Sequence, residues 1–220
     1  MPTSPKKLTN PEFQEAYTLP DWRILQRTIQ ATFRASSFSA AASFLPKIAE
    51  AADALDHHPD VDLRYPGRLR ITLTTHASKV LTSLDAELAA RISALADEAG
   101  LTSEPTSATR TEIAIDALDI ATVRPFWRAV MNYVDGGDED LVDPLRIGPA
   151  IWFQQMDEPR PDRSRIHIDV LVAEDEAEAR VAAATAAGGV LLTDIYARSF
   201  WVLADAEGNE ACVCTWQDRE

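Results

Sequence analysis

Three of the four histidines in this chain are grouped within a short stretch of sequence. His57 and His58 are adjacent and precede Pro59, and His76 ends a strand-like run. Histidine has an unperturbed pKa near neutrality, so it suits proton transfer at physiological pH. Asp53 lies about one helical turn before the pair, within reach of an imidazole that it would orient. The grouping predicts acid/base chemistry, with His57, His58 and His76 as candidate catalytic residues.

The same pattern has other interpretations that spacing alone leaves open. Adjacent histidines after a helix can form a solvated cap, and a histidine at a strand end can be an ordinary surface residue. A three-histidine metal site is a further alternative. It is less favoured because consecutive side chains point in different directions.

The elements expected around these histidines form a small α+β module. Apolar alternation predicts strands at 27–34 and 68–76, and helical spacing predicts helices at 38–55 and 83–99. Pro46 implies that the first helix is bent in its first turn or begins there. Thr82 and Asp85 have the spacing of a capping box. We expect an antiparallel sheet covered by helices on one face.

A second module is expected after a seam rich in Ser, Thr and Pro at residues 100–110. The domains are then 1–104 and 111–220. The second contains a weak internal repeat, because residues 112–118 align with 165–171. Helices are predicted at 124–133 and 175–187, and strands at 150–156, 199–204 and 210–215. This pattern predicts two βαβββ units that pair pseudo-symmetrically around a cleft.

Composition limits the classes of partner and compartment. The formal net charge of -14 opposes binding to nucleic acid or to anionic membranes. No stretch is apolar and long enough for a signal peptide or a membrane span, so we expect a cytoplasmic protein. Cys212 and Cys214 are two residues apart on a predicted strand, so their side chains point to the same face. A disulfide between such residues is geometrically poor, and we interpret them as reduced core thiols. A C-x-C metal site would need more ligands, and no other Cys and no His nearby in the sequence supplies them.

Residues 22–99 resemble the pterin-4a-carbinolamine dehydratase family. The resemblance rests on the aromatic residues of the first strand and helix, the Asp-x3-His-His-Pro motif, a tyrosine, the Ile-Thr-Leu-Thr-Thr-His run and the start of the last helix. In this sequence these are Trp22, Phe33, Phe38, Phe44, Asp53, His57, His58, Pro59, Tyr65, Ile71–His76, Leu81, Thr82 and Asp85.

The resemblance implies dehydration of 4a-hydroxytetrahydropterin to quinonoid dihydropterin, with no cofactor. It implies that His57, His58 and His76 surround the pterin, without assigning which is acid and which is base. The same resemblance implies that Asp53, Pro59 and Tyr65 bind the substrate. Asp85 is expected to cap the last helix. The chain departs from the family at Val61, where Trp is frequent, at an extra residue near 66–67, and at 77–80.

Residues 111–217 resemble the glyoxalase/bleomycin-resistance (vicinal oxygen chelate) superfamily. The supporting residues are the strand motifs at 113–116 and 166–169, Phe126, Trp127, the Trp-Phe-Gln-Gln run 152–155 and the turn 205–210. Metal-binding members place two ligands on each repeat. His167 and Glu210 match the second-half positions. In the first half, the repeat alignment places Ala114 opposite His167, and Gln154 or Gln155 stands where a carboxylate ligand is expected. Glu112 could replace a missing ligand only with a shift in register.

Two ligands are few for a transition metal, so His167 and Glu210 are candidates only, and a metal-free binding module is favoured. Trp127, Trp152 and Trp201 would line its cleft or lie in the core. The leading hypothesis is a pterin dehydratase, a hydro-lyase that acts on a small-molecule substrate and forms a homo-oligomer. The alternatives are a non-catalytic ligand-binding or dimerisation protein, and a metal-dependent lyase or dioxygenase in the second module.

Overall fold

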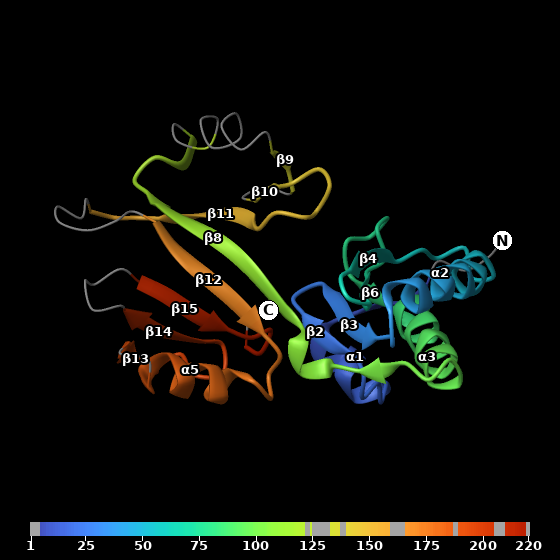
Figure 1. Cartoon of the computed structure of the whole chain (residues 1–220). Coiled ribbons are helices and arrows are strands. Elements are labelled where there is room, and N and C mark those ends of the chain that lie inside the picture. The colour runs from blue at the N-terminus through green and yellow to red at the C-terminus, as the bar shows by residue number, and fades with distance from the viewer. Residues whose placement is uncertain are drawn as a thin grey trace. The chain divides into compact units, whose positions relative to one another are not determined.

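The computed structural model describes residues 5–121, 124, 133–136, 140–158, 166–186, 189–204 and 210–218. The chain divides into two compact units, residues 1–108 and 109–220. Both are mixed α+β (Figure 1), which confirms the predicted fold class. Within the described ranges, no helix is both long enough and apolar enough to cross a membrane.

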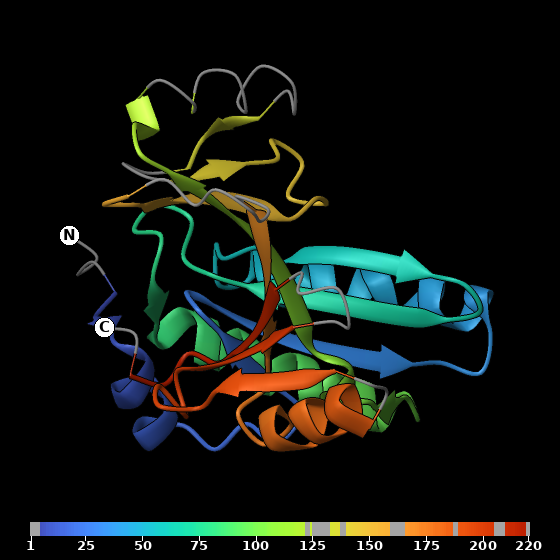
Figure 2. The ribbon, with the colours of Figure 1, turned by 90° about the vertical axis from the view of Figure 1, so that its left-hand side faces the viewer.

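The first unit is built on an antiparallel sheet in the order β2-β3-β5-β4, with β7 paired to β3. Helices α2 and α3 pack against each other, and α2 also packs against β4 and β5 (Figures 1 and 2). The helices of this unit are α1 (Asn10–Ala16), α2 (Phe38–Asp53), α3 (Ser83–Glu98) and a short 3-10 helix (Pro105–Ser107). Its strands are β1 (Lys7–Leu8), β2 (Arg23–Leu25), β3 (Thr28–Arg34), β4 (Asp60–Arg64), β5 (Arg68–Leu73), β6 (Leu81–Thr82) and β7 (Thr102–Ser103).

The alternation predicted for β5 is confirmed, because Leu69, Ile71 and Leu73 are fully buried. Two expectations need correction. The strand ends at Leu73, so His76 lies in a turn rather than at the strand end. Helix α2 begins at Phe38, as the predicted range 38–55 has it, and the hydroxyl of Ser37 caps it. The expectation that Pro46 bends the first turn or begins the helix is wrong, because Pro46 lies in the interior of the helix. The side-chain cap determines the start of the helix, and the proline removes one internal N–H donor.

The segment expected as a seam also contributes to the first unit. Strand β7 pairs with β3, and Glu104 forms ion pairs with Arg34 and Arg68 at the ends of β3 and β5. These two guanidinium groups, Arg68 foremost, lower the pKa of Glu104. The backbone N–H of Glu104 donates to Thr32. Residues 102–104 therefore complete one edge of this sheet.

The described part of the second unit contains a mixed sheet in the order β13-β14-β15-β12-β8-β11-β10-β9. Central strands β8 and β12 are antiparallel, and each pairs in parallel with the last strand of its own repeat, β11 or β15. The strands are β8 (Thr109–Ala117), β9 (Val134–Asp135), β10 (Leu141–Val142), β11 (Ala150–Gln155), β12 (Ile166–Val172), β13 (Val190–Thr193), β14 (Phe200–Ala204) and β15 (Glu210–Cys214), with helix α5 (Ala177–Ala186).

The two halves of this sheet have the same internal strand order, so the predicted repeat is confirmed in the topology. The predicted helix 124–133 and Trp127 lie outside the described residues, as does the turn 205–209. The two faces of the sheet differ. One is apolar, with Ile151 and Phe153 in one cluster and Val172, Trp201 and Val213 in another. The other face carries His167 and several carboxylates, beside a smaller buried cluster of Leu171, Cys212 and Cys214.

Candidate functional site

The loop after α2 places the two adjacent histidines. Asp56 adopts a left-handed conformation (φ 48°). The N–H of Asp56 donates to Asp53 and that of His57 donates to Ala52. These two bonds form a Schellman motif, which ends the helix and sets the direction of the chain beyond it. His57 thereby points into the unit and is only 6% exposed, whereas the side chain of His58 is 57% exposed.

Each of these histidines faces a carboxylate. The Nε2 atom of His57 lies 2.9 Å from Oδ1 of Asp85, and that of His58 lies 2.9 Å from Oδ1 of Asp53. A carboxylate accepts hydrogen bonds, so the Nε2–H group donates in both pairs. This arrangement leaves Nδ1 of each ring as the second proton-exchanging atom. The first pair is enclosed, and the second is open to solvent.

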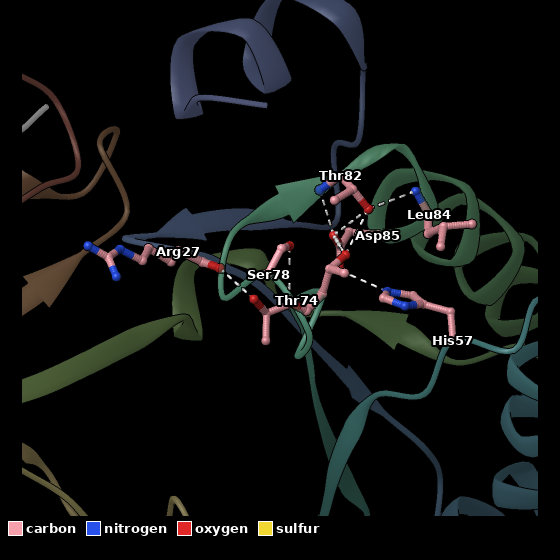
Figure 3. A network of polar contacts seen from close by, with 8 residues as sticks. Arg27, His57, Thr74, Ser78, Thr82, Leu84 and Asp85 are labelled. Carbon is pink, nitrogen blue, oxygen red and sulfur yellow. Dashed lines mark hydrogen bonds and ion pairs between the residues drawn. The ribbon is translucent and has the colours of Figure 1, made fainter. Parts of the chain in front are cut away.

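Asp85 is the centre of a buried polar network (Figure 3). Its Oδ2 atom accepts from the backbone N–H of Thr82 at 2.7 Å and from the hydroxyl of Thr75 at 2.9 Å. The hydroxyls of Thr75 and Thr82 are 2.7 Å apart. The capping box predicted for α3 is confirmed. Its carboxylate also holds residues from two distant segments, which the capping pattern does not indicate.

Through Thr75 the same carboxylate anchors the turn that carries His76. Thr75 forms a bridge with Val80 and accepts backbone N–H groups from Ser78 and Lys79. His76 is the next residue along and is exposed. The structure therefore ties the His57–His58 loop and the His76 turn to one side chain, Asp85.

The structure does not bring Tyr65 to this cluster. Pro59 directly precedes β4, and Tyr65 directly follows it, at the opposite end of the strand. At ~3.3 Å per residue, the five residues of β4 separate the two ends by roughly 16 Å. Tyr65 is 88% exposed in the hairpin turn. Of the residues predicted to bind substrate, Asp53 and Pro59 adjoin the histidines and Tyr65 does not.

The second unit gathers another set of side chains on the polar face of its sheet. His167 and Asp169 alternate on β12, and Cys212 of β15 pairs directly with Asp169. One ligand atom from each of these three residues lies within 4.8 Å of the others. The expectation that no histidine accompanies the cysteines is therefore wrong for Cys212. Parallel pairing of β12 with β15 joins residues 43 positions apart in the sequence, a separation over which local spacing carries no information.

The register also corrects the predicted equivalence between the repeats. Ile115 pairs with Phe153, and its counterpart Ile168 pairs with Ala211. Trp152, rather than Gln154 or Gln155, is therefore the counterpart of Glu210. His167 is paired with Ala114, as the repeat alignment placed it. The first repeat thus offers Ala and Trp at the ligand positions of the superfamily, and the side chains present do not fit a site with two ligands from each repeat.

Two family models match the chain, one within each of its two units. Residues 6–95 match the family model described as pterin 4 alpha carbinolamine dehydratase. A protein of Chloroflexus aurantiacus, provisionally named pterin-4-alpha-carbinolamine dehydratase, is 47% identical over 73 residues, which are 33% of this chain and 77% of that protein. The chain belongs to the pterin-4a-carbinolamine dehydratase family. A provisionally named dehydratase of Acidobacterium capsulatum is 44% identical over 78 residues, 36% of this chain and 84% of that protein.

The dehydratase-family region is joined to a second matched region. Residues 112–214 match the model described as a glyoxalase-like domain. Among solved structures, a transcriptional coactivator/pterin dehydratase from Brucella melitensis is 32% identical. The similarity covers 41% of this chain and 99% of that one, with a TM-score of 0.38. The chain thus combines a dehydratase-family domain with a glyoxalase-like domain, as the two resemblances predicted.

Proposed function

We propose that the first unit dehydrates a 4a-hydroxytetrahydropterin to the quinonoid dihydropterin. The observation that carries the proposal is the position of Asp85, whose carboxylate holds both His57 and Thr75, the neighbour of His76. A dehydratase of this family needs its histidines fixed relative to one another. One buried side chain that anchors both segments meets that need.

The reaction requires two proton transfers and no change in oxidation state. The C4a–O bond breaks as an acid protonates the 4a-hydroxyl, and water leaves. A base removes a proton from the adjacent ring nitrogen, and the electron pair of that N–H bond forms the C=N double bond. Imidazoles supply both functions near neutral pH, as donors when protonated and as acceptors when neutral. Such a reaction proceeds without a metal or redox cofactor.

The two adjacent histidines are suited to different tasks. His57 is held by Asp85 in an enclosed position, so its ring is fixed and its Nδ1 atom is directed by that contact. His58 is exposed, and the pair that it forms with Asp53 leaves it accessible to solvent protons. We infer that the enclosed ring and the exposed ring exchange protons with different atoms of the pterin. Asp53 and Pro59 adjoin the same loop, and we propose them as substrate contacts.

The test is an absorbance assay for loss of 4a-hydroxytetrahydropterin, with the full chain and the variants His57→Ala, His58→Ala and His76→Ala. Positioned acid/base groups contribute about 10²- to 10⁴-fold to rate, so each variant should lose at least about a hundredfold in kcat. Asp97→Asn, in an exposed position near the end of α3, is the control and should keep the wild-type rate. Wild-type turnover at the uncatalysed rate, or three histidine variants as active as wild type, would refute the proposal.

A further inference from the structure

The polar face of the second unit presents three different metal-binding groups at one point. His167 and Asp169 share a face because they are two residues apart on β12, and Cys212 shares it because it is the direct partner of Asp169. Their ligand atoms lie within 4.8 Å of one another. We propose that His167, Asp169 and Cys212 bind a divalent transition-metal ion, zinc above all, in a site that the dehydratase reaction does not use.

The donor set indicates which ion the site would take. An imidazole nitrogen, a thiolate and a carboxylate oxygen are together the ligands of zinc and similar borderline ions, whereas magnesium and calcium prefer oxygen alone. The Nε2 atom of His167 is 3.6 Å from Oδ1 of Asp169, which is too long for a hydrogen bond. Two ligand atoms bound ~2.0–2.1 Å from a tetrahedral zinc ion are about 3.3 Å apart. The observed separation needs only a small closure to reach that value.

A second carboxylate lies on the opposite side of the His167 ring. Oδ1 of Asp116 is 3.6 Å from Nδ1 of His167. When Nε2 binds a metal ion, the ring proton lies on Nδ1, and a small closure of the 3.6 Å separation would let that N–H group donate to Asp116. Metal-binding histidines are commonly oriented by an outer carboxylate in this way. Asp116 therefore supplies the orientation, and its negative charge also favours a cation nearby.

The three residues differ in burial. Asp169 and Cys212 are almost fully buried, whereas the side chain of His167 is 19% exposed. The ring of Trp152 stands edge-on to His167, with centroids 6.1 Å apart. Three protein ligands are the usual number at a zinc site whose fourth position takes water or a small ligand.

This site differs from the arrangement expected from the superfamily. There each repeat supplies two ligands, but here Ala114 and Trp152 occupy the first-repeat positions. All three proposed ligands come from the second repeat, on β12 and β15. Glu210, predicted with His167 as a ligand candidate, lies on β15 two residues before Cys212 and is not part of the three-residue cluster found among the described residues.

Cobalt(II) provides a test that does not depend on enzyme activity. The full chain, reduced and freed of metal, is titrated with Co²⁺ and then with Zn²⁺. We expect a thiolate-to-cobalt charge-transfer band that saturates at one equivalent and disappears as zinc displaces cobalt. Cys212→Ala should abolish the band. Cys214→Ala is a matched control, because it removes a buried cysteine of the same strand that is not in the cluster, and it should keep the band.

Three further variants separate metal binding from folding. His167→Ala and Asp169→Asn should each weaken cobalt binding by more than about a hundredfold, and Asp116→Asn by about 10- to 100-fold, the usual effect of losing an outer-shell partner. If Cys212→Ala does not fold, as judged by circular dichroism, these variants decide the question. The proposal is overturned if wild type gives no saturable band, or if folded Cys212→Ala or Asp169→Asn titrates like wild type. Neither result would bear on dehydration by the first unit.

Discussion

The imidazole of His57 and the carboxylate of Asp85 form a hydrogen-bonded pair, 2.9 Å apart, that is almost fully enclosed. The carboxylate simultaneously caps α3 through the backbone N–H of Thr82. One side chain therefore stabilises a helix and orients a candidate catalytic ring. Substitutions that affect these two roles unequally can distinguish them.

Replacing Asp85 with Asn should reduce both stability and rate. The amide keeps the shape of the side chain but changes its hydrogen bonding to His57, and an imperfectly satisfied buried group costs about 1–3 kcal/mol. We expect kcat to fall about tenfold or more and the pH dependence of kcat to change, because the ring of His57 is no longer held. Urea unfolding and the pH–rate profile measure the two effects.

Thr82→Ala is the control for this prediction. It removes a cap hydroxyl but leaves the His57–Asp85 pair, so it should cost about 1 kcal/mol of stability with an unchanged pH–rate profile. If Asp85→Asn and Thr82→Ala had the same pH profile as wild type, Asp85 would be purely structural.

Asp53→Asn should have a different effect, because the Asp53–His58 pair is exposed. Ion pairs in such positions contribute little to folding, so we expect stability close to that of wild type. The ring of His58 loses its carboxylate partner and becomes freer to rotate, and we expect kcat to fall several-fold, less than for Asp85→Asn. Steady-state kinetics beside Asp97→Asn measure the difference. A loss of stability as large as that of Asp85→Asn would contradict this account.

The sequence was sufficient for the elements that depend on local pattern. The alternation in β5, the capping box at Thr82 and Asp85, and the position of His57 and His58 after a helix are all properties of neighbouring residues. The resemblance of particular residues to known families predicted which two families the two units match. The repeat in the second unit was visible because residues 112–118 and 165–171 share a pattern.

Contacts between distant segments could not be read in the same way. The Asp85–His57 bond joins residues 28 positions apart, and the Cys212–Asp169 pairing depends on the register of a parallel ladder. A shift of one residue in such a ladder moves a side chain to the other face. For this reason the equivalence of Glu210 with Trp152, and the distance of Tyr65 from the histidines, became evident only from the pairing of the strands.

Glu104→Gln should make the first unit less stable at neutral pH but not in acid. The hydrogen bond from Arg68, supported by Arg34, holds the pKa of Glu104 below its usual value of 4.5. A carboxyl group with a lowered folded-state pKa stabilises the fold above its unfolded pKa, and the effect is lost as the pH falls through the folded value. The difference between wild type and Glu104→Gln should therefore be about 1 kcal/mol at pH 7 and should shrink as the pH falls below 4.5 and through the lowered pKa of Glu104.

Hydrogen exchange of peptides from β3 and β5 is a suitable measurement for Glu104→Gln. Wild type and variant are compared at the same pH, so that intrinsic exchange rates cancel. Glu98→Gln, an exposed substitution at the end of α3, should show no pH-dependent difference from wild type. A difference for Glu104→Gln that grew toward low pH would have the wrong sign for this interpretation.

Gly67→Ala tests why the β4–β5 turn contains a glycine. A Cβ atom there would lie 2.6 Å from the carbonyl oxygen of Ser37 and 2.8 Å from its carbonyl carbon. Ser37 caps α2, and the carbonyl of Gly67 accepts the N–H of Ala35 at 2.8 Å. The turn therefore packs backbone against backbone, and a methyl group should cost about 1–3 kcal/mol by overpacking. We expect faster hydrogen exchange at Ala35.

Gly100→Ala is the control for this prediction. A Cβ atom at Gly100 would meet no atom within 4 Å, but the φ of this residue is +68°. The substitution should lower stability through backbone strain and leave exchange at Ala35 unchanged. Equal exchange at Ala35 in both variants would show that this close approach does not hold the turn in place.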